Sequence, residues 1–157
     1  MKIGLLDQKH IPEYSNFSRG IISKTDYYSP LAKKGEMKKF LAKNIRIDLK
    51  NKNKVYFYIT EKGKIIAFRS GYFDCGTFWG DWIGVDPKFR RKGISLSFQN
   101  YLENYLKKFH VHKIWCDCRT DNKESINSLK KRGYRKIAKI KNYWYHQDFY
   151  IWEKLLK

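Results

Sequence analysis

Residues 85–95 read Val85-Asp86-Pro87-Lys88-Phe89-Arg90-Arg91-Lys92-Gly93-Ile94-Ser95, and they join an apolar segment to an amphipathic one. Four basic side chains stand just before Gly93. Glycine lets a backbone approach a ligand without a Cβ in the way, and the first amides of a helix attract anions because they have no internal partner. Basic side chains add charge-assisted hydrogen bonds. The stretch therefore predicts a phosphate-binding loop between a strand and a helix.

Apolar periodicity on either side of this loop predicts one α/β domain over residues 1–157. The expected elements, in order, are strand 2–6, a helix or loop at 8–19, helix 31–46, strands 54–60, 65–73 and 77–85, a helix from Gly93 to about residue 109, strand 113–119, helix 121–131, and strands 134–142 and 148–154. Turns around Gly63 and Gly76 make the three middle strands an antiparallel meander. The helical crossover then makes strands 77–85 and 113–119 parallel.

Two local patterns add detail to this outline. Strict alternation in strand 77–85 predicts two faces, with Phe78, Trp82 and Gly84 on one and Trp79, Asp81, Ile83 and Val85 on the other. Asp121, with Glu124 three residues later, is expected to cap the helix that follows it.

The charge balance is strongly positive, with 34 Lys and Arg against 15 Asp and Glu and a formal net charge of +19. This charge favours nucleic acid, an anionic cosubstrate or an acidic surface as partner; the alternative interpretation is a solvated surface of lysines. No apolar run is long enough to span a bilayer, and the N-terminal apolar stretch is too short for a signal peptide. The odd set Cys75, Cys116 and Cys118 indicates reduced thiols without a metal site, so we expect a cytoplasmic protein with no membrane partner.

The loop resembles a known family. Arg90-x-x-Gly93-x-Ser95, behind the strand end 83–87, is similar to the acetyl-CoA pyrophosphate loop of the GNAT N-acetyltransferases, whose pattern is Gln/Arg-x-x-Gly-x-Gly/Ala. Ser95 is a small departure from that pattern. The order of the expected elements is also the order of that family.

A second stretch extends the resemblance. Residues 122–134 are similar to the family's second motif at Asn122, Ser125, Leu129, Gly133 and Tyr134. The chain departs from the motif at Lys130, where the family commonly has a tyrosine. The resemblance implies the GNAT fold, a mixed and mostly antiparallel sheet of about seven strands that splays between strands 4 and 5 after Val85, flanked by about four helices.

The resemblance also implies a cosubstrate and the residues that hold it. Acetyl-CoA would bind with its pantetheine arm on the main chain of Ile83 and Val85. Its pyrophosphate would lie on the basic loop and the helix start, which comprise Arg90, Arg91, Lys92, Gly93, Ile94 and Ser95. Asn122 would contact the pantetheine or order the nearby backbone; its alternative role is helix capping.

Family members transfer acetyl directly to an amine, which must first lose a proton, and the leaving thiolate then needs a proton or a hydrogen bond. Asp81 is the candidate base because neighbouring aromatic side chains would raise its pKa; the alternative is a structural ion pair. Tyr143, and next Tyr145 on the same face, are the candidate acids; the alternative for both is aromatic packing. The acceptor would be a primary amine of a protein, a peptide or a small molecule such as an amino sugar, and the enzyme a monomer or homodimer.

Two other functions stay open. Basic and aromatic residues alternate in Lys141-Asn142-Tyr143-Trp144-Tyr145-His146, which is a pattern suited to stacking on nucleic-acid bases beside phosphate contacts. A nucleic-acid-binding module without enzymatic activity is therefore an alternative, although no recognised nucleic-acid motif is present. The other alternative is a GNAT domain that binds CoA without turnover, since Lys130 departs from the family motif.

Overall fold

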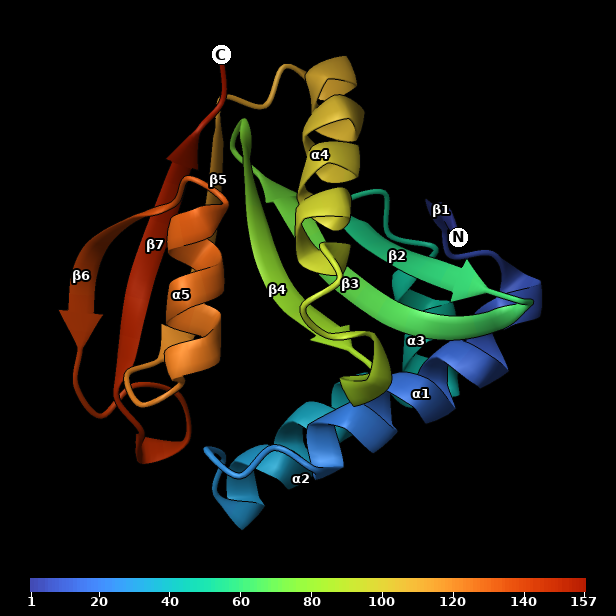
Figure 1. Ribbon diagram of the computed structural model, residues 1–157, viewed down its shortest axis with the longest axis horizontal. Coiled ribbons are helices and arrows are strands. Elements are labelled where there is room, and N and C mark those ends of the chain that lie inside the picture. The colour runs from blue at the N-terminus through green and yellow to red at the C-terminus, as the bar shows by residue number, and fades with distance from the viewer.

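The computed structural model describes residues 1–157 as one seven-stranded mixed sheet with helices on both faces (Figure 1). The strands follow the spatial order β1-β2-β3-β4-β5-β7-β6. The elements are β1 Lys2–Leu5, α1 Ile11–Ser23, α2 Pro30–Lys39, α3 Ala42–Asp48, β2 Lys54–Glu61, β3 Lys64–Asp74, β4 Thr77–Val85, α4 Ile94–Leu106, β5 Lys113–Arg119, α5 Lys123–Lys131, β6 Arg135–Ile140 and β7 Phe149–Leu155. No helix has the length and apolar character needed to cross a membrane.

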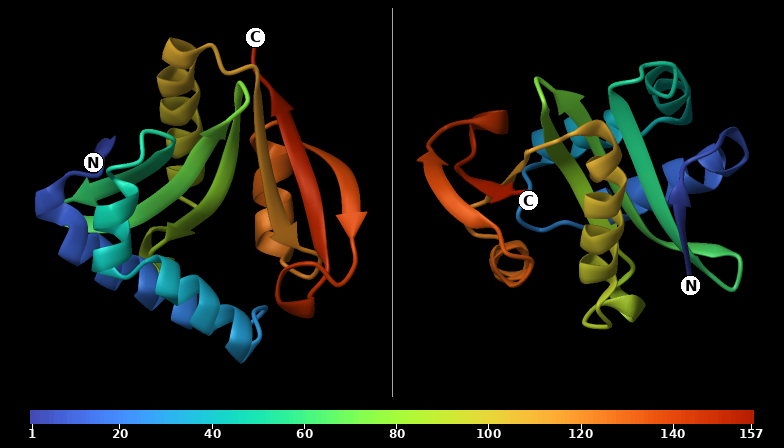
Figure 2. Two further views of the ribbon diagram at one scale, coloured as in Figure 1. Left: turned by 180° about the vertical axis from the view of Figure 1, so that it is seen from behind. Right: turned by 90° about the horizontal axis from the view of Figure 1, so that it is seen from above.

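The helices divide between the two faces of the sheet. Figure 2 shows α1, α2 and α3 on one side of the strands and α4 and α5 on the other. Each face has its own core: Phe98 and Leu102 of α4 pack with Phe57 on one side, while Tyr14 of α1 and Phe40 pack on the other. The β1–β4 half of the sheet is therefore packed between α4 on one face and α1 on the other.

The pairing of β4 with β5 is short. Both strands run parallel, as predicted, but only Thr77–Gly80 pairs with Lys113–Cys116. Beyond the last pair, Gly80 with Cys116, the two strands separate and leave a wedge-shaped gap in the hydrogen-bonded sheet. The predicted splay between strands 4 and 5 is confirmed; the prediction that it begins after Val85 is wrong, because pairing ends five residues earlier.

A β-bulge interrupts β4 at the same point. Ser70 of β3 pairs with Trp82 and Gly71 pairs with Gly80, so Asp81 has no partner in the register. An extra residue moves every later side chain to the opposite face. The predicted alternation is therefore wrong: Phe78 packs in the core under α4, whereas Trp82 packs on the α1 side with Phe68.

The N-terminal third departs most from the sequence-based outline. The segment left open as helix or loop at 8–19 forms a short 3-10 turn, Gln8–His10, followed by α1. The single helix expected at 31–46 is two helices, because Leu41 takes an extended conformation (φ −63°, ψ 137°) and begins α3 anew. The chain therefore has five α-helices where about four were expected.

Candidate active site

The basic loop has the backbone of an anion-binding turn. A 3-10 turn, Pro87–Phe89, precedes it, and α4 begins at Ile94. Arg91 and Gly93 both have left-handed backbones, with φ of 62° and 77°. The first helical hydrogen bond runs from the Ser97 amide to the Gly93 carbonyl at 2.9 Å, so the amides of residues 94–96 precede the helix's own bonding. They are available for an anion, as are the exposed side chains of residues 90–92.

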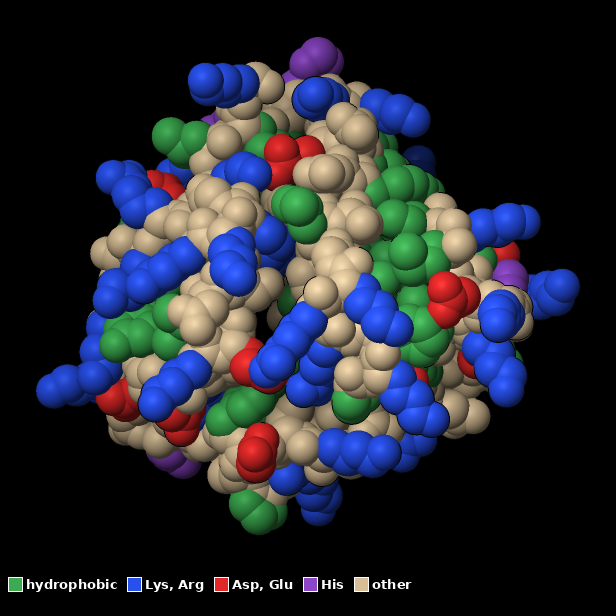
Figure 3. Space-filling model, viewed as in Figure 1, with side chains coloured by type: hydrophobic (Ala, Val, Ile, Leu, Met, Phe, Trp, Pro, Cys, Tyr) green, Lys and Arg blue, Asp and Glu red, His purple; other side chains and the backbone are tan.

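Arg90 connects the loop to the other side of the wedge. Its Nη1 lies 3.3 Å from Glu124 Oε2 at the start of α5, and its Nε donates to the Val85 carbonyl at 3.4 Å. Both partners of the ion pair are largely exposed, so the pair is weak and exchangeable. Figure 3 shows a hollow on this face, between the ribbons labelled β4 and α5 in Figure 1, with Lys and Arg side chains along its edge.

The edge of β4 that faces the wedge carries main-chain groups without a strand partner. The Asp86 amide donates to the Ile66 carbonyl of β3 at 2.9 Å. Antiparallel pairing alternates along a strand, so Gly84 also faces β3 while Ile83 and Val85 direct their main-chain groups toward the wedge. An extended ligand can add to this edge in the manner of another strand.

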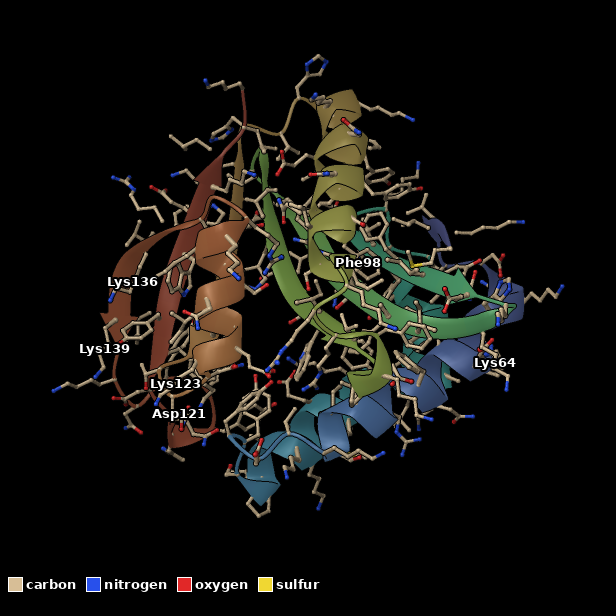
Figure 4. The ribbon with its side chains drawn as sticks, viewed as in Figure 1. Lys64, Phe98, Asp121, Lys123, Lys136 and Lys139 are labelled. Atoms are coloured by element: carbon tan, nitrogen blue, oxygen red, sulfur yellow. The ribbon has the colours of Figure 1, made fainter.

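Asn122 caps α5. Its Oδ1 accepts a hydrogen bond from the Ser125 amide at 3.0 Å, which is the N-cap arrangement. The expectation that Asp121 is the cap is wrong, since Asp121 Oδ2 instead accepts from Arg119 Nη2 at 2.9 Å. Figure 4 shows Asp121 and Lys123 together at the start of α5, while Lys136 and Lys139 lie on β6 at the left edge of the view.

On the opposite face of the wedge, a cavity of about 180 Å³ opens between α2, the β4 and β5 strands and the loop before β7. Its lining is mostly aromatic and carries charges of both signs. The lining residues are Tyr28, Glu36, Lys39, Lys54, Tyr72, Trp79, Asp81, Trp82, Asp117, Trp144, Tyr145 and Phe149.

Two carboxylates mark the point where the strands part. Asp81 of β4 and Asp117 of β5 each follow directly after the last pair, Gly80 with Cys116, and both line the cavity. Burial raises the pKa of Asp81, although the charge of Lys39 opposes it, which confirms the expected direction. Burial raises the pKa of Asp117 to about 7; a hydrogen bond from Trp144 opposes this rise, and the Asp81 charge adds to it.

Glu36 of α2 organises the cavity wall. It is only 6% exposed and accepts hydrogen bonds from Trp82 Nε1 at 2.7 Å and from the Tyr145 hydroxyl at 2.9 Å. Lys39 Nζ lies 2.8 Å from the same carboxylate. A Cβ on Gly35 would collide with the Tyr145 ring, so the missing side chain at 35 leaves the space that Tyr145 occupies.

The two candidate tyrosines, Tyr143 and Tyr145, lie in a turn and not on a strand. Residues 144–146 form a 3-10 turn, and Tyr145 has φ 53°, so the argument that Tyr143 and Tyr145 share a strand face is wrong. Tyr145 lines the cavity, but its hydroxyl is engaged by Glu36. Tyr143 packs against Trp144, with ring centroids 4.5 Å apart, and burial with the nearby Asp117 charge raises its pKa.

Asp117 and Glu36 were not among the site residues predicted from the sequence. Asp117 had a signal, because Cys116 and Cys118 alternate around it as buried residues and place it on the other face. Glu36 had no such signal, since α2 is polar on most sides and its buried glutamate follows no apolar stripe.

The basic loop lies at the start of α4 beside the unpaired edge of β4, and the two carboxylates with the aromatic cavity lie on the other side of the sheet. The Acetyltransferase (GNAT) family model matches residues 22–134, which is more than half of the chain. The chain belongs to the GNAT acetyltransferase family.

Named relatives agree with this assignment. The chain is 28% identical over 90 residues to the [Ribosomal protein bS18]-alanine N-acetyltransferase of Escherichia coli (strain K12), covering 56% of this chain and 60% of that protein. The crystal structure of the E. coli ribosomal-protein-S18-alanine N-acetyltransferase superposes with a TM-score of 0.76 at 19% identity, covering 99% of this chain and 94% of that one. The PaiA N-acetyltransferase of Thermoplasma acidophilum, in complex with coenzyme A, superposes at 0.82 and 14% identity, with 99% of each chain covered. These structural similarities show the fold.

Proposed function

We propose that this enzyme acetylates the free α-amine at the N-terminus of a protein or peptide, with acetyl-CoA as donor. The observation that carries the proposal is the pair Asp81 and Asp117. Each is the first residue beyond the last β4–β5 pair, and both have a raised pKa beside an aromatic cavity. Such a pair suits an acceptor that arrives as an ammonium ion and must give up its proton.

The donor side fits the family's cosubstrate. Acetyl-CoA supplies a thioester carbonyl to the acceptor amine. The amides at the start of α4, Gly93 and the exposed side chains of residues 90–92 would hold its pyrophosphate. Ile83 and Val85 would receive the pantetheine arm on the main-chain groups that face the wedge, where the arm would replace the bond from Arg90 Nε to the Val85 carbonyl. Asn122 would face the arm while capping α5.

The acceptor side favours Asp117 as the base. An ammonium ion has no lone pair, so a group with a pKa near the working pH removes its proton most effectively. Asp117 meets that condition with a pKa of about 7. Burial is the main cause of this raised pKa, and the negative charge of Asp81 adds to it. Activity should therefore increase as the pH rises through about 7.

The size of the cavity favours the end of a chain over a large free ligand. Its volume of about 180 Å³ is below the roughly 300–1,000 Å³ of pockets that enclose whole drug-sized ligands. One terminal residue fits such a space while the rest of a peptide lies outside. The similarity to alanine N-acetyltransferases that act on a ribosomal protein supports this choice, over the 60% of their length that the chain matches.

The test is a steady-state assay with acetyl-CoA and short lysine-free peptides that begin with alanine, serine or methionine. The same peptides with a blocked N-terminus are the controls. We expect turnover of the free peptides only, and a loss of about 10²-fold or more in kcat/KM for Asp117→Asn, in the range of lost general-base catalysis. Turnover confined to lysine side chains or small amines would refute the acceptor, and absence of CoA binding by calorimetry would refute the donor.

A further inference from the structure

Two buried arginines without a carboxylate partner lie near Gly80 and Cys116, the last β4–β5 pair. We call this point the closed end of the wedge. Arg69 of β3 is 4% exposed and Arg132, at the end of α5, is 6% exposed. No carboxylate oxygen lies within 4.0 Å of either guanidinium. Instead, both donate to the same neutral acceptor, Gln99 Oε1 of α4, at 3.1 and 3.4 Å. Buried arginines are normally paired, so this arrangement calls for a role.

The surrounding groups leave the centre positive. Tyr134 also donates to Gln99 Oε1, at 3.1 Å, and remains neutral because burial raises its pKa. The side-chain amide of Gln99 donates to the Glu103 carboxylate at 2.8 Å, and Lys154 also contacts that carboxylate. The cluster therefore contains three cations (Arg69, Arg132 and Lys154) and one carboxylate (Glu103), which gives it a net charge of +2. Mutual repulsion shows in Arg132, whose pKa is lowered by burial and by the Arg69 charge.

The position of this centre relates it to the reaction. A Cβ built on Gly80, the last β4 residue paired with β5, would lie 3.7 Å from Arg69 Nη2. The free edge of β4 runs from Val85 back toward Gly80, so an arm bound along it ends at this closed end. The charges already act on a thiol there: burial raises the pKa of Cys116, the partner of Gly80, to about 12, and the charges of Arg132 and Arg69 oppose that rise.

We propose that Arg69 and Arg132 form a buried positive centre that stabilises the CoA thiolate released by acyl transfer, an inference that rests on the proposed function. The acceptor nitrogen forms its bond to the acyl carbon, the C–S bond breaks, and its electron pair leaves on sulfur. The ammonium gives its first proton to a carboxylate at residue 81 or 117 before attack, which frees the lone pair, and the nitrogen releases its second proton to solvent once the C–N bond has formed. These carboxylates lie on the other side of the sheet, and their negative charge disfavours a thiolate nearby. The positive charge of Arg69 and Arg132 offsets this repulsion.

The same proposal accounts for a departure from the family motif. Where the family commonly has a tyrosine, this chain has Lys130, which is exposed on α5. The Tyr145 hydroxyl is held by Glu36. Stabilisation of the thiolate by fixed positive charge does not require a proton donor at either position, since the anion can leave unprotonated and take its proton from water.

The test measures the thiol pKa of bound CoA from the ultraviolet absorbance of its thiolate as a function of pH. A free thiol has a pKa of about 8.5, and cationic surroundings lower it to about 7.5 or below. We expect such a lowered value in the wild-type complex. Arg69→Met and Arg132→Met should each raise the pKa of the bound thiol by about one unit. Arg46→Met, at an exposed arginine of α3, is the matched control and should leave it unchanged.

Gln99→Glu separates this role from a structural one. It places a carboxylate between the two guanidiniums in nearly the same volume, and the new ion pairs offset the loss of the bond from Gln99 Nε2 to Glu103, so the variant should stay folded. The bound-thiol pKa should rise and kcat should fall about tenfold, with little change in KM for acetyl-CoA. It also remains informative if an arginine variant does not fold. CoA that binds with an unshifted thiol pKa in the wild type, or a pKa unchanged by Gln99→Glu, would overturn the inference. Absence of CoA binding would instead count against the proposed function.

Discussion

Replacing Asp117 with asparagine should make the protein more stable at alkaline pH while it removes activity. The carboxyl pKa rises from the ordinary 3.8 to about 7 on folding, a difference of about 3 units. Each unit corresponds to 1.36 kcal/mol, so ionised Asp117 destabilises the folded state by up to about 4 kcal/mol above pH 7. Asparagine keeps an oxygen that can accept the hydrogen bond from Trp144 Nε1, which is 3.0 Å in the wild type.

The sign of the pH dependence follows from proton binding. Between about pH 4 and 7 the folded state holds a proton on Asp117 that the unfolded chain releases, so the free energy of unfolding falls as the pH rises through this window. The Asp117→Asn variant has no carboxyl at this position, so its free energy of unfolding does not fall in this way. The difference in unfolding free energy between variant and wild type should therefore be near zero at about pH 3.5 and increase to about 3–4 kcal/mol at pH 8.

Urea denaturation of both proteins at intervals across that range measures the difference. Asp148→Asn is the control of opposite sign, because the Asn142 amide and Lys139 lower the pKa of the exposed Asp148 carboxyl. Its stabilising effect is present above about pH 4 and lost as the pH falls through the lowered pKa. A difference between Asp117→Asn and wild type that does not change with pH would refute the assignment of a protonated, desolvated carboxyl to this position.

Three further substitutions test the parts of the site separately. Gly93→Glu combines a strained left-handed backbone with a negative charge at the start of α4, so CoA affinity measured by calorimetry should fall more than tenfold, whereas Gly93→Ala should cost about 1 kcal/mol of stability and less affinity. Asn122→Ala removes the bond to the Ser125 amide and should lower stability by about 1 kcal/mol, which thermal unfolding measures. Gly35→Ala should displace Tyr145 from its cavity position, so peptide KM should rise while CoA affinity stays unchanged.

Much of the strand-and-helix order was predictable because apolar periodicity carries it. The observed bounds of β4 and β5 match the expected 77–85 and 113–119, since buried β-branched, aromatic and cysteine residues mark both. The break between α2 and α3 was not predictable in the same way. Apolar residues recur at helical spacing across 31–46, and only the extended backbone of Leu41 divides the segment.

The candidate site was predictable where one local pattern defines it. Gly93 and its basic neighbours form a self-contained loop, and the structure gives that loop the expected left-handed glycine. Asp81 was predicted on the same face as Trp79, and both line the cavity. The facing of Trp82 was not predicted, since a bulge inserts one residue without any change in the alternating sequence. The turn at Tyr143 and Tyr145 depends on contacts with α2, more than a hundred residues earlier, which no local pattern records.

The early end of β4–β5 pairing, together with the bulge, gives the wedge two electrically different faces. Pairing between β4 and β5 stops at Gly80 and Cys116, and the next residue on each strand, Asp81 or Asp117, lines the aromatic cavity. Directly behind the same pair, Arg69 brings positive charge to the other face. A thioester held in the gap would therefore have proton acceptors on the side of the incoming amine and positive charge on the side of the departing sulfur. That polarity matches the direction in which electrons move during acyl transfer, because negative charge passes from the amine side to sulfur.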